Sequence, residues 1–290
     1  MTRAVVDACA SLVNGARASG RTATWKRSIL ATALDDAVEK GLLEANPVRH
    51  LSWTAPRTTA RIDRRSVVNP TQARALLDAV RHTPRSGASL VAFFGCMYYS
   101  ALRPEEATNL REHNLDLPAQ GWGWLTLETS AAEVDRHWTD SGGRRDQREL
   151  KHRAEGETRR VPNPPELTAL LHEHLTTYGT DQQGRLFHGE RGGHLAGVTY
   201  TRLWARARRT ALTPQQDASP LARRPYDLRH AAVATWLNGG VAPAQVAEWA
   251  GHSVEVLLRV YAKCLDGGED QSLRRPATHS ATRDHRSTTR

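Results

Sequence analysis

Apolar residues recur at helical spacing along most of this chain, and a stretch of a different period interrupts them. Residues three and four positions apart share one face of a helix, so each such segment predicts an amphipathic helix. By contrast, residues 122–129 are rich in aromatic and β-favouring side chains, and a second extended run ends at 159–162. We interpret the polar residues 130–148 between them as a loop insertion. The sequence therefore predicts a mainly α fold with a small antiparallel β-sheet.

Turn and capping residues bound several of these helices. Asn69 precedes Pro70 and an apolar stripe, as expected of an N-cap residue followed by proline in the first turn. Arg103-Pro104 breaks the helical pattern and so holds an arginine at a turn. The expected helices begin at Pro70 and Pro165 and also cover residues 3–18, 22–40, 87–101, 105–112, 198–212, 228–238, 243–250 and 254–264.

Composition divides the chain into four parts. Residues 1–55 hold two helical patterns that Asn46-Pro47 ends, which predicts a small helical domain. Residues 56–68, with several Thr and Arg, predict a linker. The main domain is expected at 69–265. Residues 266–290 have almost no hydrophobic side chains and cannot offset their ordering entropy, so we expect a disordered basic tail.

The charge of the chain is compatible with a polyanionic partner. Its 290 residues include 40 Lys and Arg against 31 Asp and Glu, which gives a net charge of +9. An ordinary solvated basic surface explains this excess equally well. The three cysteines are far apart and lack the spacing of a disulfide framework or a zinc site, which favours a reduced, cytoplasmic compartment. No apolar run approaches the ~20 residues of a membrane helix, so we expect a soluble protein without a membrane partner.

Several residues are suited to breaking a phosphodiester bond, which requires charge stabilisation at the phosphoryl group, a nucleophile and a proton donor. Arg103 and Arg229 lie at helix boundaries in apolar surroundings, and a guanidinium pair can bind the oxygens of one phosphate. His252 precedes Ser253, an expected N-cap, and Tyr261 lies in the helix that follows. Singly, each fits an ion pair or a core residue. Together they predict a phosphoryl-transfer site that uses no metal or other cofactor.

Three sequence boxes carry a family resemblance. Ala101-Leu102-Arg103-Pro104-Glu105-Glu106-Ala107 resembles the first arginine box of the tyrosine recombinases, or phage-type integrases. Pro225-Tyr226-Asp227-Leu228-Arg229-His230 resembles their second box. Trp249-Ala250-Gly251-His252-Ser253, followed by Tyr261, resembles their terminal box. The order and spacing also match, over about residues 70–264. The resemblance implies a tyrosine-recombinase catalytic domain preceded by a short, reduced helical core-binding domain that clamps DNA.

The resemblance also implies a role for each matching residue. Tyr261 would attack the scissile phosphate and form a 3′-phosphotyrosine, Arg103 and Arg229 would hold the phosphoryl oxygens, and His252 would add a hydrogen bond. The family's general acid is a lysine in a β-hairpin, a place that Lys151 matches; it is the only lysine between Lys40 and Lys263. A lysine can transfer a proton that an arginine holds too tightly. An ordinary exposed lysine is the alternative.

The implied activity is site-specific DNA recombination without metal or ATP. The implied partners are double-stranded DNA with paired recombination sites, three further copies in a homotetramer, and accessory DNA-bending or directionality factors. A bacterial or phage-type protein associated with the nucleoid in the cytoplasm would fit this activity. Glu106 and His230 are expected to support the site. The residues expected to contact DNA are Arg61, Arg64, Arg65, Arg159, Arg160, Arg223 and Arg224.

Two departures from the family pattern leave alternatives open. Tyr226 stands where the family usually has histidine, and a phenol is a poorer proton acceptor near pH 7; we expect it to form a wall of the site. Little sequence precedes the helices that resemble the end of the core-binding domain. A catalytically weak or inactive DNA-binding accessory protein derived from an integrase is therefore the alternative. A helix-turn-helix regulator using residues 226–250 ranks last, because it gives Lys151 and Tyr261 no role.

Overall fold

A computed structural model describes residues 2–54, 62–133, 137, 145–150, 156–190 and 192–261. The chain divides into two compact units, Met1–Ala60 and Arg61–Arg290. Within the described ranges, no helix combines the length and the apolar character needed to cross a bilayer.

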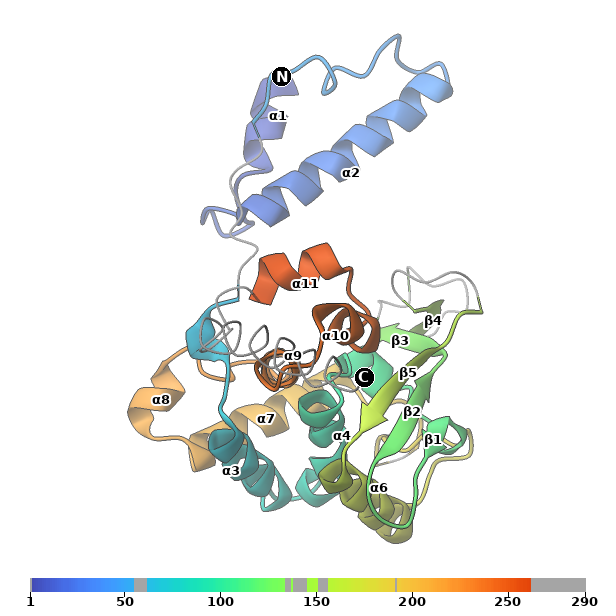
Figure 1. Cartoon of the computed structure of the whole chain (residues 1–290). Coiled ribbons are helices and arrows are strands. Elements are labelled where there is room, and N and C mark those ends of the chain that lie inside the picture. Colours follow the sequence, from blue (N-terminus) through green and yellow to red (C-terminus); the bar gives the residue numbers. More distant parts are fainter. Residues whose placement is uncertain are drawn as a thin grey trace, which may run out of the picture. The chain divides into compact units, whose positions relative to one another are not determined.

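The first unit contains two helices, α1 (Thr2–Ala8) and α2 (Gly20–Glu39) (Figure 1). Ser19 caps α2 by accepting a hydrogen bond from the backbone N–H of Thr22. The expected helix over 3–18 is wrong beyond Ala8. There the chain turns through Gly15, whose φ is +80°, and Val13 points into solvent. Helical spacing of apolar residues alone did not reveal this turn, because those residues do not form one buried face.

The second unit is built around α4 (Gly87–Tyr99), which is buried along most of its length. It packs against α3 (Pro70–Arg81), α6 (Pro165–Tyr178) and α9 (Asp227–Asn238). Asn69 and Gln72 form a capping box at the start of α3, so the predicted cap is confirmed. The remaining helices are α5 (Pro104–Ala107), α7 (Gly197–Ala211), α8 (Pro214–Ala218), α10 (Pro243–Ala250) and α11 (Val254–Tyr261), with 3-10 turns at η1 (Arg64–Ser66) and η2 (Glu112–Asn114).

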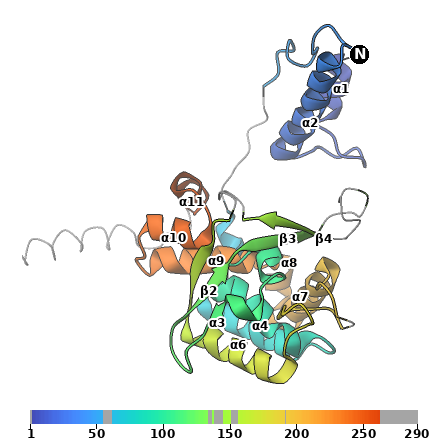
Figure 2. The same ribbon diagram turned by 90° about the vertical axis from the view of Figure 1, so that its right-hand side faces the viewer.

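Two antiparallel sheets lie together on one side of these helices (Figures 1 and 2). The first has the strand order β1-β2-β5, formed by β1 (Leu115–Asp116), β2 (Gly123–Leu127) and β5 (Arg159–Asn163). Its register pairs Leu125 with Val161, and both side chains are buried. The second consists of β3 (Thr129–Glu133) and β4 (Arg145–Glu149), which pair along their whole length.

The β3–β4 pair corrects the expectation of a loop over 130–148. Of the β3 side chains only Ala131 is buried, so the sequence lacks the alternation of apolar and polar residues that identifies a half-buried strand. The expected helix over 105–112 is also shorter: α5 ends at Ala107, and a 3-10 turn follows at Glu112–Asn114. Lys151 and the tail 266–290 lie outside the described residues.

Candidate active site

Three turns that are far apart in the sequence meet in the second unit. They are the turn between α4 and α5, the turn that leads into the start of α9, and the turn between α10 and α11. Arg103 is the N-cap residue of α5, Arg229 lies in the first turn of α9, and Gly251 ends α10 in a left-handed conformation. Arg103 and Arg229 are 6% and 0% exposed. The helix break expected at Arg103-Pro104 therefore aims this guanidinium inward.

Arg229 links the other two turns. Its Nη1 donates to the carbonyl oxygen of Ala101 and its Nη2 to that of Ala250. Nη2 also lies 3.0 Å from His252 Nε2. Ala101 has a φ of +51°, an uncommon conformation for a residue with a Cβ, and this conformation belongs to the turn that presents its carbonyl to Arg229. The Nε of Arg229 is buried without a hydrogen-bond partner among the described residues.

Glu106 holds two arginines together. It is 2% exposed and accepts from Arg103 Nη1 at 2.6 Å and from the Arg103 backbone N–H at 2.8 Å. Arg159, on β5, approaches with both terminal nitrogens, at 3.0 Å from Oε1 and 2.7 Å from Oε2. Burial alone would raise the pKa of Glu106, but attraction by Arg159 and Arg103 outweighs it and keeps this pKa well below its usual range. Glu106 is therefore ionised and fixes both guanidiniums.

Gly251 allows these arginines to approach the α10–α11 turn. Its φ and ψ are 61° and 50°, and its carbonyl oxygen accepts from Arg103 Nη2 at 2.8 Å. A Cβ at this position would lie 2.3 Å from Arg159 Nη1 and 3.3 Å from Arg103 Nη1. Only glycine fits both the backbone conformation and the space.

The tautomer of His252 follows from its contact with Arg229. A guanidinium can only donate, so His252 Nε2 is the acceptor in this contact. Burial, with repulsion from Arg229 and Arg103, lowers the pKa of His252 to about 3. The neutral ring then carries its proton on Nδ1, which is buried without a hydrogen-bond partner among the described residues. His252 therefore presents an unused N–H donor.

Tyr261 ends α11 inside the same cluster. It is 1% exposed, and its Oη lies 3.0 Å from His230 Nδ1. The His252 and Tyr261 ring centroids are 6.1 Å apart. Tyr226 packs edge-on against His230 at 5.1 Å and lies 5.9 Å from the Arg229 guanidinium carbon. The described candidates Arg103, Arg229, His252 and Tyr261 thus lie in one cluster with Tyr226, Glu106 and His230.

The arginines expected to contact DNA differ in their surroundings. Arg159 is 1% exposed and bound to Glu106, because alternate residues of β5 face opposite sides. Arg160, the next residue, is exposed, stacks over Trp124 at 4.6 Å and pairs with Asp116. Arg61 lies outside the described residues. Arg64, Arg65, Arg223 and Arg224 are exposed, Arg65 pairing with Asp63 and Arg224 with Asp227.

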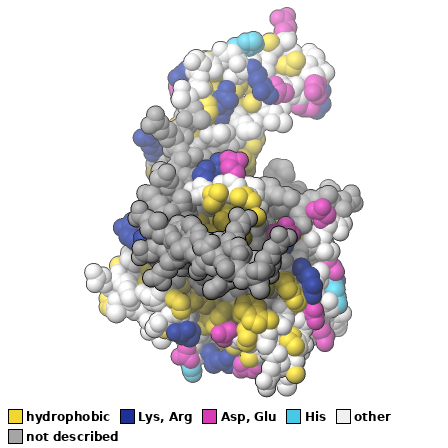
Figure 3. Space-filling view, viewed as in Figure 1, with side chains coloured by type: hydrophobic (Ala, Val, Ile, Leu, Met, Phe, Trp, Pro, Cys, Tyr) yellow, Lys and Arg dark blue, Asp and Glu magenta, His cyan; other side chains and the backbone are white. Residues whose placement is uncertain are grey.

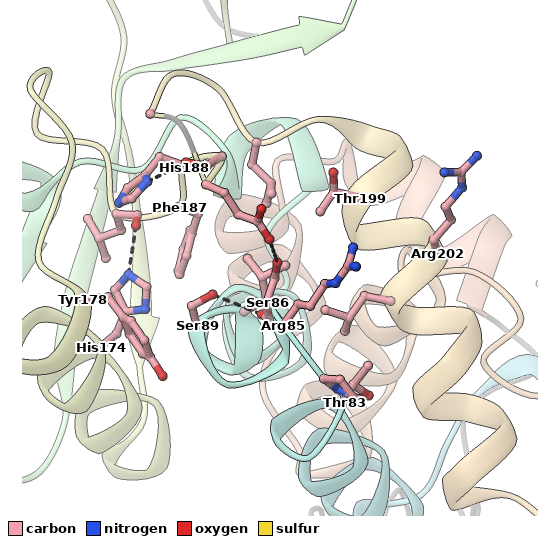
Figure 4. A pocket seen from close by; sticks show the side chains of 18 of the residues that line it. Thr83, Arg85, Ser86, Ser89, His174, Tyr178, Phe187, His188, Thr199 and Arg202 are labelled. Atoms are coloured by element: carbon pink, nitrogen blue, oxygen red, sulfur yellow. Dashed lines mark hydrogen bonds between the residues drawn. The ribbon is translucent and has the colours of Figure 1, made fainter.

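Surface charge by itself does not mark a binding face on the one side of the described residues that Figure 3 shows. On the face visible in Figure 3, basic and acidic side chains are interspersed. A cavity of about 1060 Å³ lies elsewhere in the second unit, with Leu90, Phe187 and Leu203 among its apolar lining and Arg85 and Arg202 at its edge (Figure 4). None of the candidate site residues lines it.

Comparison with known proteins identifies the family. The family model described as "Phage integrase family" matches residues 66–266. The chain belongs to the phage integrase family. The residue boxes that suggested tyrosine recombinases therefore gave the correct family. No curated protein matches the chain.

Solved structures of integrases share this fold. The Tn1549 transposon integrase in complex with transposon right end DNA has a TM-score of 0.65 and 17% identity, covering 91% of this chain and 80% of that one. The XerH recombinase bound to difH has a TM-score of 0.61 and 14% identity, and the match covers 95% of this chain and 71% of that one. A lambda integrase dimer bound to a COC′ core site has a TM-score of 0.55 and 15% identity, and the match covers 81% of this chain and 70% of that one. The prediction of a mainly α fold with a small antiparallel sheet, as in tyrosine recombinase catalytic domains, is confirmed.

Proposed function

We propose that this integrase-family chain is a site-specific DNA recombinase that cuts and rejoins DNA through a 3′-phosphotyrosine. The observation that carries the proposal is a set of unused buried donors. Arg229 Nε, Arg159 Nε and His252 Nδ1 have no hydrogen-bond partner among the described residues. Buried N–H groups without acceptors are costly, and these three belong to one cluster around Tyr261. An anionic ligand such as a phosphodiester would supply the missing acceptors.

The cluster has the groups that phosphoryl transfer requires. Arg103 and Arg229 would hold the non-bridging oxygens, and the Nδ1–H of His252 would donate to one of them. Tyr261 Oη would attack phosphorus, releasing the 5′-oxygen and forming the phosphotyrosyl bond. Lys151, matched by its place in the family pattern, would give its proton to that oxygen. A 5′-hydroxyl from a partner strand then reverses the step without ATP.

Glu106 would act through other residues, and Arg159, whose terminal nitrogens bind Glu106, would offer only its Nε to the ligand. Glu106 fixes Arg103 through two of its contacts and Arg159 through two more. The buried ion pair therefore sets the positions of guanidiniums before DNA arrives, which is the preorganisation that charge stabilisation needs. Because Tyr261 is 1% exposed, the groups that cover it must move before a phosphate can reach its hydroxyl.

The proposed partner is double-stranded DNA carrying paired recombination sites. The Tn1549 integrase structure contains transposon right end DNA, the XerH structure a palindromic difH substrate, and the lambda integrase structure a COC′ core site. Residues 1–55 would clamp the duplex as a reduced core-binding domain, joined by 56–68 to the catalytic domain at 69–265. A homotetramer on DNA, with accessory bending or directionality factors, completes the proposal. Exposed arginines, among them Arg64, Arg160 and Arg223, would contact the phosphate backbone of the DNA.

Tyr226 favours a second candidate, a DNA-binding accessory protein with weak or no cleavage activity. Its ring faces Arg229, and a phenol there is a poor proton acceptor. This candidate predicts salt-dependent binding to DNA without any covalent product.

Covalent trapping on DNA distinguishes the two candidates. The full chain first selects its preferred duplexes from a random-sequence pool, and a nicked form of these is then incubated with protein and separated on a denaturing gel. We expect a protein–DNA adduct from the parent and from Tyr178→Phe, a control on an exposed tyrosine of α6. Tyr261→Phe should form none. An adduct of equal amount from Tyr261→Phe contradicts the proposed nucleophile.

A further inference from the structure

The hydrogen bond between Tyr261 and His230 has no role in the proposed binding of phosphate. His230 Nδ1 lies 3.0 Å from Tyr261 Oη, within normal hydrogen-bonding distance. His230 is on α9, directly after Arg229, and Tyr261 is the last residue of α11. The contact therefore joins the two segments that supply the phosphate-binding arginine and the proposed nucleophile.

The other nearby histidine is already committed as a donor. His252 Nε2 accepts from Arg229 Nη2, and its Nδ1 carries the proton. His252 can therefore hold a phosphoryl oxygen but has no nitrogen free to accept a proton. Tyr226 occupies the family's histidine position, and its phenol is a poor acceptor. In contrast, His230 already contacts the hydroxyl that must lose its proton.

We infer that His230 is the proton acceptor for Tyr261 in strand cleavage, in place of the histidine that the family has at position 226. The inference rests on the proposed function. As the Tyr261 oxygen bonds to phosphorus, its proton passes to His230 Nδ1, while the bond from phosphorus to the 5′-oxygen breaks and that oxygen takes a proton from the general acid. The charge of the imidazolium formed is balanced by the loss of the general acid's proton. In religation both proton transfers run in reverse.

The packing around His230 supports this assignment. The Tyr226 ring meets it edge-on at 5.1 Å, and the Tyr261 ring lies 5.8 Å away, so the imidazole packs against two aromatic rings. Tyr226 is one helical turn before His230. With tyrosine in place of the family's histidine, position 226 supports the ring of His230. A ring fixed in this way keeps Nδ1 directed at the Tyr261 hydroxyl.

Charges around His230 favour its neutral form before DNA binds. Burial, together with repulsion from Arg229 and Arg224, lowers the pKa of His230 to about 3. Its lone pair is therefore available near neutral pH. A bound phosphodiester brings a negative charge beside Arg229, opposes that repulsion and stabilises the imidazolium as it forms. Proton acceptance is thereby coupled to the presence of substrate.

Substitution of His230 by asparagine tests the inference. Asparagine can keep a hydrogen bond near the Nδ1 position but cannot take up a proton at neutral pH. The readout is the single-turnover rate of adduct formation by the full chain on the selected nicked duplex. We expect His230→Asn and His230→Gln to react about 100-fold or more slowly than the parent, as for loss of a general base. His82→Asn, an exposed histidine at the end of α3, is the matched control and should react at the parental rate.

Two further readouts separate proton acceptance from a structural role. A duplex with sulfur in place of the scissile 5′-oxygen has a leaving group that needs no proton, so it rescues loss of a general acid but not of the acceptor. We expect His230→Asn to stay slow on this duplex. The rate of adduct formation by His230→Asn should also rise tenfold per pH unit, because hydroxide must now remove the Tyr261 proton. The parental rate should rise less steeply.

The outcomes distinguish this inference from the proposed function. If the parent forms a Tyr261-dependent adduct and His230→Asn is within threefold of it, the inference fails and the proposed function stands. Full rescue of His230→Asn by the sulfur-containing duplex also overturns the inference. If the parent forms no adduct, or Tyr261→Phe forms as much as the parent, the proposed function fails and takes the inference with it.

Discussion

Replacement of Glu106 by glutamine tests how the site is held together. Glu106 accepts four hydrogen bonds, two on each oxygen, from the Arg103 backbone and from the guanidiniums of Arg103 and Arg159. Glutamine is similar in size, but its amide nitrogen faces two donors whichever way it is oriented. Two contacts are lost, and two buried guanidiniums remain without a counter-charge. Hydrogen bonds to charged groups contribute about 1.5–3 kcal/mol each, and breaking a buried ion pair costs about 3–5 kcal/mol. We expect the free energy of unfolding to fall by about 3–5 kcal/mol.

Denaturant unfolding at several pH values measures this loss. Because the folded pKa of Glu106 lies below its unfolded value of 4.5, its stabilising contribution is complete above pH 4.5 and disappears as the pH falls through the folded value. The difference between parent and Glu106→Gln should therefore shrink below pH 4.5. Glu173→Gln breaks a more exposed pair with Arg81 and serves as the control, with an expected loss below about 1 kcal/mol. A loss from Glu106→Gln as small as that of the control would refute the reasoning.

Three further predictions concern other parts of the second unit. Gly251→Ala should lower the free energy of unfolding by at least about 1–2 kcal/mol, because the left-handed backbone disfavours a Cβ that would also lie 2.3 Å from Arg159 Nη1; parental stability in a denaturant titration would contradict this. Asn69→Ala should cost about 1 kcal/mol by removing the cap of α3 and leave the adduct rate unchanged, since the cap lies outside the site; an adduct rate that falls with the cap would show this separation to be wrong. His252 has a folded pKa of about 3 against 6.5 unfolded, so the unfolded chain binds more protons between these values, and stability should fall as the pH drops below 6.5. His252→Gln, which removes the histidine that Arg229 and Arg103 repel, should remove this part of the decline. If the free energies of unfolding of parent and variant change equally between pH 7 and pH 5, His252 does not contribute to the pH dependence.

The helices with one apolar face were predictable from the sequence, and the less regular elements were not. Asn69 and the stripe that follows it placed α3 correctly, because capping and burial are both local signals. Pairing of β3 with β4 depends on backbone hydrogen bonds between polar segments, which leave no hydrophobic period. The turn after Ala8 was missed for the opposite reason, since the apolar residues beyond it suggested a helix that they do not form.

Residues that position the site were harder to predict than those matching family boxes. Arg159 and Arg160 read as a basic pair, yet strand alternation turns Arg159 inward with Val161 and Arg160 outward. The apolar side chain of Val161, two residues further along the same strand, was the sequence signal that could have placed Arg159 inside. Glu106, three residues after Arg103, has the spacing of a capping box, which could have predicted its contact with the Arg103 backbone. Its second partner, Arg159, is distant in sequence and required the fold.

Identification of the residue joined to DNA tests the central claim most directly, because two tyrosines, Tyr226 and Tyr261, lie in the same cluster. The covalent adduct of the full chain with a nicked duplex is digested with protease and nuclease, and the nucleotide-bearing peptide is sequenced by mass spectrometry. The account predicts a 3′-phosphotyrosyl bond at Tyr261. A nucleotide attached to Tyr226, or to any other residue, would contradict it.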